Sequence, residues 1–136
     1  MYTNTTKFTM GGSPLHNLRS EAFTIDMGNV VVPRNIINAN EIMITDRAVT
    51  GNVTLEAALP SSKNWWTGGI ESHAGVLTNV LQLIHGTVSG NKIKLDAPAV
   101  QITSVAQQES EGLLVYQFGL SFTPVSGNDE LLIQTY

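Results

Sequence analysis

The stretch that decides the fold is TGNVTLEA, residues 50–57, in which apolar and polar side chains alternate. Val53, Leu55 and Ala57 fall on one face of an extended chain, and Pro60 ends the run. Because successive side chains of a strand point to opposite faces of its sheet, this alternation indicates a strand with one buried face. The stretch therefore predicts a domain built on β-sheet.

Similar runs of apolar and β-branched residues cover most of the chain, with turn signals between them. Val, Ile and Thr supply 36 of the 136 residues, and all three favour strands. The expected strands are residues 7–10, 22–27, 30–32, 41–45, 50–57, 76–85, 100–105, 113–123 and 131–134, and residues 87–95 include a Gly-Asn turn signal. Strands at this spacing predict a mainly β fold, either an antiparallel β-sandwich or a partly closed barrel, in one domain spanning residues 1–136.

Three segments depart from this pattern, and a proline precedes one of the expected strands. Residues 1–21 are polar and predict an extended N-terminal arm that holds the short strand at 7–10. Residues 35–40 contain three Asn, which favours a loop. Residues 61–67 begin with a Ser that can cap one short flanking helix, which two glycines end. The strand at 100–105 follows Pro98.

Composition excludes several classes of protein. Hydrophobic residues make up 42% of the chain, too many for a disordered tail. Only 13% of the residues are charged, and the net charge of −4 argues against a general nucleic-acid clamp. The absence of cysteine excludes a disulfide framework, a thiolate nucleophile and a Cys-ligated zinc. The apolar runs are too short to span a membrane and no signal peptide is visible, so we expect a soluble chain kept in a cytoplasm until it assembles.

The search for catalytic residues finds no coherent set. His16, His73 and His85 lie far apart in the sequence, and none has a partner at metal-ligand spacing. His85 ends a strand beside a glycine, and we interpret it as a partly exposed structural residue rather than a catalytic one. Asp26 falls on the outward face of its strand, where a solvated carboxylate is expected.

Two pairs of carboxylates lie at turns. Glu109 and Glu111 share a hairpin tip, and Asp129 and Glu130 share the last turn. Such pairs do acid–base work or bind calcium only with supporting oxygens in a concave pocket, so solubilising charges are the simpler interpretation. The glycines at 86–91 are not followed by Lys-Ser or Lys-Thr and form no phosphate loop. We therefore predict no catalytic, cofactor or metal site, and no enzyme.

Trp65 and Trp66 form the one aromatic cluster that looks exposed. They could stack on a sugar ring, or they could be core or a contact between subunits, which we favour because no polar cradle accompanies them. The alternative function left open by this pair is a carbohydrate-binding or other ligand-binding β-sandwich module. A chain with few charges, no site and many strand edges is otherwise suited to association with other chains.

Five pieces of sequence, in order over residues 22–136, resemble the tail tube proteins of long-tailed bacteriophages and prophages. They are FTIDMGNVVVPR (23–34), ITDRAVTGNVTLE (44–56), HGTVSGNKI (85–93), APAVQ (97–101) and SGNDELLI (126–133). The second departs from the family pattern because Asn52 replaces a small Ser. In the relatives this stretch is the later part of a longer chain, and a fuller helix stands at residues 61–69.

The resemblance implies a structural subunit of the virion tail, made in the bacterial host cytoplasm. It implies copies that form rings, hexameric or pseudo-hexameric, which stack with other tail proteins into a tube for DNA. A channel through which DNA slides should not hold phosphates, which agrees with the net acidic composition. We expect Asp, Glu, Asn, Thr and Ser to line the lumen, and the basic residues to lie in ring contacts or outside.

Overall fold

The computed structural model describes residues 6–11, 16–17, 19–57 and 79–136, which form ten strands and no helix. The strands are β1 (Thr6–Gly11), β2 (His16–Asn17), β3 (Ser20–Asp26), β4 (Asn29–Ile36), β5 (Ala39–Arg47), β6 (Thr50–Glu56), β7 (Asn79–His85), β8 (Ile93–Ser110), β9 (Leu113–Phe122) and β10 (Leu132–Thr135). The expected helix at residues 61–67 lies outside the described residues. The mainly β prediction is confirmed for the part that is described.

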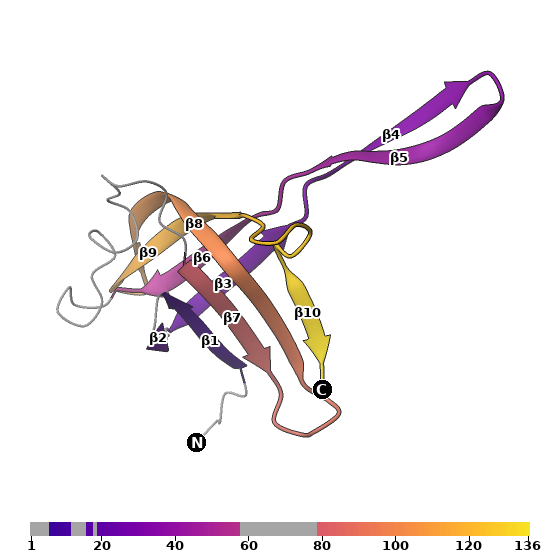
Figure 1. Ribbon diagram of the computed structural model, residues 1–136. Coiled ribbons are helices and arrows are strands. Elements are labelled where there is room, and N and C mark those ends of the chain that lie inside the picture. Colours follow the sequence, from indigo (N-terminus) through magenta and orange to yellow (C-terminus); the bar gives the residue numbers. More distant parts are fainter. Residues whose placement is uncertain (1–5, 12–15, 18, 58–78) are drawn as a thin grey trace.

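Eight strands form one antiparallel sheet in the order β2-β1-β7-β8-β9-β6-β3, and β10 pairs with β8 beside this path. The sheet curls into a half-barrel (Figure 1). The second sheet contains only β4 and β5, which project away from the main sheet and cover neither of its faces (Figure 1). Of the two architectures that the sequence predicted, the structure therefore has the partly closed barrel and not the sandwich.

The buried residues form one cluster on the curled sheet, drawn mainly from β1, β6, β7, β8 and β9. Its members are Phe8, Met10, Val49, Val53, Leu55, Leu81, Ala97, Val100, Ile102, Phe118, Leu120 and Phe122. Val53 and Leu55 are 0% and 1% exposed, as the alternation in residues 50–57 predicted. Burial of apolar surface on this scale is the main favourable term in folding.

Strand β8 begins at Ile93 and runs through Pro98, so the strand expected at residues 100–105, after the proline, was placed too short. The register of β7 against β8 shifts between Leu81 and Asn79, opposite Pro98. A proline is tolerated at such an irregularity because its missing N–H need not join the ladder. The long strand then changes partners, since Ile93–Asp96 pair with β10 and Val100–Ser110 pair with β9.

The predicted loop at residues 35–40 is the end of a tight hairpin. Asn35 pairs with Asn40, and only Ile37 and Asn38 lie in the turn. Asn38 has a φ of 68°, in the left-handed region that asparagine tolerates better than most residues. The Asn-rich composition therefore marked the turn correctly, but it overestimated the turn's length.

Part of the predicted N-terminal arm belongs to the main sheet. Over residues 1–21, Thr6–Gly11 pair with β7 and contribute Phe8 and Met10 to the core, which confirms the short strand expected at 7–10. His16 and Asn17 pair with β1 as the two-residue strand β2. Among the described residues there is no helix with the length and apolar character needed to cross a membrane.

Candidate functional site

The most exposed apolar surface lies on the hairpin of β4 and β5. In an antiparallel pair, residues directly opposite each other share a face, and that face alternates along each strand. The register places four apolar residues on one face, which we call the aliphatic face: Val31, Pro33, Ile42 and Ile44. Val31, Ile42 and Ile44 are 55%, 76% and 64% exposed, so nothing in the described chain covers this face.

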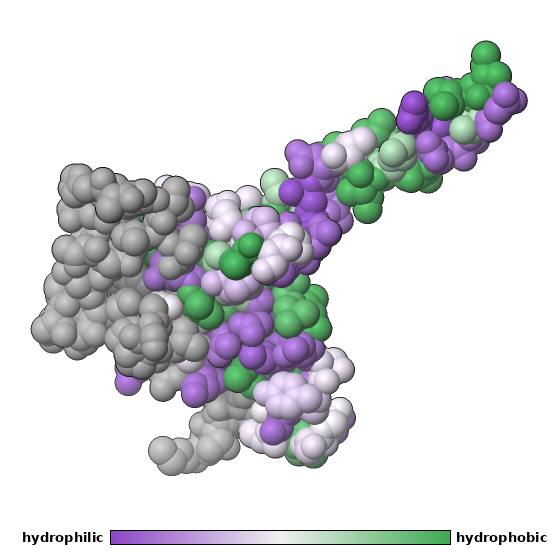
Figure 2. All heavy atoms as spheres, viewed as in Figure 1, coloured by the Kyte–Doolittle hydropathy of each residue, from purple (hydrophilic) through white to green (hydrophobic). Residues whose placement is uncertain are grey.

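The opposite face of the hairpin has a different character. Val32 and Met43 are less exposed there, at 41% and 39%, and the next pair toward the turn is Arg34 opposite Glu41. The turn residue Ile37 is 93% exposed. Figure 2 shows hydrophobic and hydrophilic residues side by side along the projecting hairpin. The aliphatic face thus carries no charged residue at its two pairs, Val31 with Ile44 and Pro33 with Ile42. The opposite face carries the oppositely charged pair Arg34 and Glu41.

This exposure is unusual for a part of a folded chain. A two-stranded hairpin is at best marginally stable alone in water, and large exposed apolar patches mark interaction surfaces. Sequence reasoning predicted the strands here but did not identify the surface. The signal available was the pair of apolar runs at 30–32 and 42–44 on either side of an Asn-rich turn, and it indicates a hairpin without telling whether a core covers it.

Two short joints connect the hairpin to the main sheet. Met27 and Gly28 link β3 to β4, while Ala48 and Val49 link β5 to β6. Gly28 has a φ of 56°, and a Cβ atom there would collide with the carbonyl oxygen of Ala48. The amide of Gly28 donates a 2.9 Å hydrogen bond to Oδ1 of Asp26. Asp26 is exposed, as predicted, and its carboxylate also organises this joint.

A second contact ties the root of the hairpin to the loop before β10, which lies beside it in Figure 1. Nη2 of Arg47, the last residue of β5, donates 2.6 Å to Oε2 of Glu130 and 3.2 Å to Oδ1 of Asn128. The Glu130 side chain is 14% exposed and that of Arg47 is 32% exposed. The hydrogen bond from Arg47 is the main cause that lowers the pKa of Glu130 from its ordinary value.

Asp129 and Glu130 are therefore structural residues, and their interpretation as plain solubilising charges is wrong. The carboxylate of Asp129 accepts hydrogen bonds from the amides of Val125, at 2.9 Å, and Ser126, at 3.0 and 3.1 Å. The sequence shows these two acids only as neighbours at a turn. The partner of Glu130 is apparent only in the structure, where β5 lies next to the loop. The sequence did not identify Arg47 as a functional residue.

The other predicted residues do not come together. Glu109 and Glu111 are exposed at the β8–β9 turn. His85 is exposed, and its Nδ1 lies 2.7 Å from Oγ1 of Thr6. Within the described ranges no three His, Asp or Glu side chains gather where they could hold a metal ion. His16 lies in β2, while His73 and the pair Trp65 and Trp66 lie outside the described residues.

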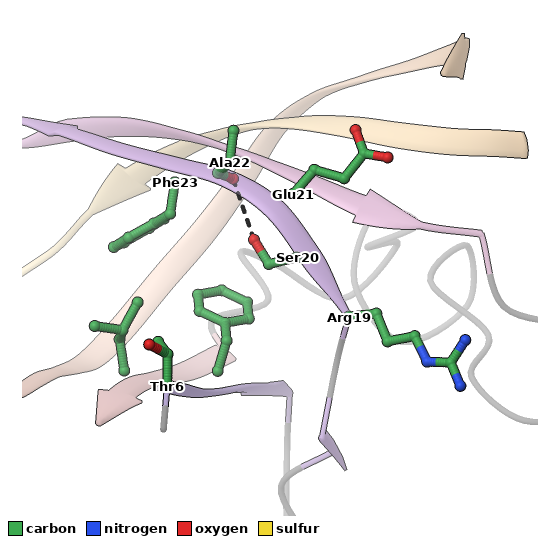
Figure 3. Close-up of a pocket in the computed structure, with 8 residues that line it drawn as sticks. Thr6, Arg19, Ser20, Glu21, Ala22 and Phe23 are labelled. Carbon is green, nitrogen blue, oxygen red and sulfur yellow. Dashed lines mark hydrogen bonds between the residues drawn. The ribbon is translucent and has the colours of Figure 1, made fainter. Parts of the chain in front are cut away.

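A cavity of about 390 Å³ lies where the two ends of the curled sheet face each other. Phe8, Phe23 and Leu83 give it an apolar lining. Figure 3 shows Arg19 and Glu21 pointing away from Thr6 at its rim. Arg19 forms a 3.2 Å ion pair with Glu56 instead of facing the cavity. Thr6 lines the cavity and its hydroxyl lies beside the ring of His85, but both residues are exposed, and we assign no chemistry to this pair or to the cavity.

No family model matches the chain, and no curated protein sequence matches it. Several solved structures contain a chain of similar fold. One is the sheath/tube terminator of the PVC extracellular contractile injection system in its extended state, at a TM-score of 0.70 and 9% identity, covering 99% of this chain and 96% of that one. The second is the tube-terminating cap of the anti-feeding prophage, at a TM-score of 0.64 and 14% identity, covering 100% of this chain and 91% of that one.

The third is the virion of a native gene transfer agent particle, at a TM-score of 0.53 and 11% identity, covering 94% of this chain and 95% of that one. At these identities the similarity establishes the fold. The resemblance to tail tube proteins that the sequence suggested is confirmed at that level. The chain has the tail tube-type fold found in phage-like tails and contractile injection systems.

Proposed function

We propose that the chain is a structural, non-catalytic subunit of a phage-type tail tube. Copies of it assemble into hexameric or pseudo-hexameric rings that stack around a channel for DNA. The observation that carries this proposal is the aliphatic face of the hairpin, because it exposes Val31, Ile42 and Ile44 on an element that extends from the body of the chain. An apolar surface on a projecting element is suited to contact with another subunit.

The body of the chain offers a different exposed apolar surface that a neighbour can use. It lies at β10 and consists of Ile93 and Ile133, which share one face of the sheet by the register with β8 and are 46% and 62% exposed; Leu132, 50% exposed, lies on the other face. Two different apolar surfaces in one chain are suited to a head-to-tail contact. In such a contact the aliphatic face of one copy packs against the surface at β10 of the next copy. Such a contact closes into a ring when the rotation between copies closes and otherwise continues as a filament. In the proposed tube it closes the ring, and the stacking of rings requires a separate contact.

The fold supports a place in the tail of a virion. We propose in addition that the chain is made in the host cytoplasm before assembly. The net charge of −4 supports a channel that does not hold DNA. We propose that Asp, Glu, Asn, Thr and Ser line the lumen. The basic residues then lie in ring contacts or on the outside of the tube, where they cannot retain phosphates.

Electron microscopy and sedimentation velocity of the purified chain at increasing concentration test the proposal. We expect rings or tubes for the native chain and their loss in Ile42→Asp/Ile44→Asp, because the new carboxylates would be buried without partners in a contact. The matched control is Glu41→Gln, which removes a charge from the opposite face and should assemble normally. A native chain that stays monomeric at every concentration would overturn the proposal.

A further inference from the structure

We propose that Arg47 is a positioning residue that fixes the angle of the hairpin relative to the main sheet by bonding to the loop before β10. The ion pair of Arg47 with Glu130 and its hydrogen bond to Asn128 form what we call the latch. The claim that this angle matters for assembly rests on the proposed function. The latch itself is a property of the single chain.

Apart from the local hydrogen bond between the Gly28 amide and Asp26, the joints at the root of the hairpin provide little restraint. In the main sheet the ladder of β3 and β6 ends at the pair of Asp26 and Thr50, and in the hairpin the ladder of β4 and β5 begins at Asn29 and Arg47. Between them, the amide of Ala48 approaches the carbonyl oxygen of Gly28 at 3.5 Å, which is long for a hydrogen bond. A ladder that is interrupted at both strands can bend at the interruption.

Arg47 acts directly beside this interruption. Val49, two residues further on, is 3% exposed and is held in the core, where its carbonyl oxygen accepts a 3.0 Å hydrogen bond from the amide of Phe122. The body side of the joint is therefore fixed, and the hairpin side is fixed through the Arg47 guanidinium. Neither β4 nor β5 pairs with a strand of the main sheet in the described part of the chain.

The loop that receives Arg47 is a firm anchor. Thr123, at its beginning, donates from its amide and its hydroxyl to the carbonyl oxygen of Ala99, at 2.9 and 3.2 Å. The Asp129 carboxylate holds the amides of Val125 and Ser126. A group attached to this loop is thus attached to β8 and β9. The latch transfers that rigidity to the hairpin.

The latch has defined acceptors, but it does not give every donor of the Arg47 guanidinium a hydrogen-bond partner. Charge-assisted hydrogen bonds such as that of Arg47 to Glu130 are among the stronger polar contacts in proteins. Nε of Arg47 is buried and has no acceptor within the described part of the chain, so the guanidinium is held at one nitrogen. Burial without a partner costs free energy, which leaves the latch able to open. Its role is to select one hairpin angle among those that the joints permit.

Distance measurements between two spin labels test the latch in dilute, monomeric protein. The chain has no cysteine, so Ile37→Cys at the hairpin turn and Glu109→Cys on β8 give two unique sites. Both residues are exposed. We expect one narrow distance distribution in this background. Arg47→Met, which keeps much of the side chain's length but removes its donors, should broaden the distribution or shift it.

Three further variants make the result decisive. Arg34→Met removes a hairpin arginine that does not reach the loop, and it should leave the distribution narrow. Glu130→Gln breaks the ion pair from the other side without touching the hairpin, so it should broaden the distribution even if Arg47→Met fails to fold. Arg47→Lys should restore part of the narrowing, because an ammonium can pair with Glu130 but lacks the rigid planar group that fixes the directions of the donors.

An unchanged narrow distribution in both Arg47→Met and Glu130→Gln would overturn the latch. The measurement does not require assembly, so failure of the native chain to form tubes would leave this result standing. If the native chain does assemble, Arg47→Met should form fewer or irregular rings while its aliphatic face remains intact. Normal rings formed by a variant with a broad distribution would show that the angle does not matter for assembly and would overturn that part of the proposal.

Discussion

The rings of Phe8 and Phe23 meet across the opening of the half-barrel, with their centroids 5.4 Å apart and their planes tilted by 55°. Phe8 belongs to β1, near one end of the sheet, and Phe23 belongs to β3, the strand at the other end. Tilted aromatic pairs at this separation are favourable beyond their burial alone. This contact joins the two ends of a sheet that no hydrogen-bonded ladder closes among the described strands.

We expect Phe8→Ala to be one of the most destabilising single substitutions in the chain. Phe8 is 5% exposed, and truncation of a buried phenylalanine costs about 3–5 kcal/mol. Urea unfolding followed by tryptophan fluorescence or circular dichroism measures the loss. Leu113→Ala is the control, because Leu113 is 54% exposed and its truncation should have little effect. Equal losses for the two variants would contradict the role assigned to Phe8.

Gly28→Ala should destabilise the joint at the root of the hairpin. The added Cβ would collide with the carbonyl oxygen of Ala48, and Gly28 has a φ of 56°, which side chains rarely adopt. Strained backbone of this kind costs about 1–3 kcal/mol. The matched control is Gly90→Ala, at a φ of 86° with no atom within 4 Å of the new Cβ. Thermal unfolding should show the larger loss for Gly28→Ala. A larger loss for Gly90→Ala would mean that the joint can relax.

The Arg47–Glu130 ion pair predicts a defined pH dependence. The pKa of Glu130 is lowered in the folded chain, chiefly by the hydrogen bond from Arg47. A carboxylate with a lowered pKa contributes stability that is present above the pKa of the unfolded chain and is lost as the pH falls through the folded pKa. The stability difference between the native chain and Glu130→Gln should therefore shrink on acidification. A difference that is constant between neutral and strongly acidic pH would contradict the ion pair.

Assembled protein should bind duplex DNA weakly. Three of the chain's basic residues are already in ion pairs, Arg19 with Glu56, Arg47 with Glu130 and Lys94 with Asp96. Each Lys or Arg that neutralised a phosphate would add affinity and salt dependence. Gel-shift titration at low salt should show no defined complex at micromolar protein. Micromolar binding that falls steeply with added salt would show a phosphate site and contradict the proposed channel.

Local patterns in the sequence predicted much of the fold. The strand at residues 50–57, the strand at 7–10 and the turn at 109–112 follow from alternation and turn chemistry, which act within a few residues. The prediction at residues 35–40 was wrong about the length of the turn, because Asn35 and Asn40 pair across the hairpin instead of lying in its turn. The strand expected to follow Pro98 begins before it, because the register irregularity that admits the proline depends on the pairing with β7.

The sequence by itself determined which residues become strands and which face of β6 is buried, because a period of two and β-branched side chains act locally. Only the tertiary structure decided what covers each strand. Val31 and Ile44 have the same apolar character as Val53 and Leu55, yet they are exposed because β4 and β5 leave the main sheet at Gly28 and Ala48. Glu130 and Arg47 stand 83 residues apart in the sequence, and they meet because folding brings the end of β5 beside the last loop.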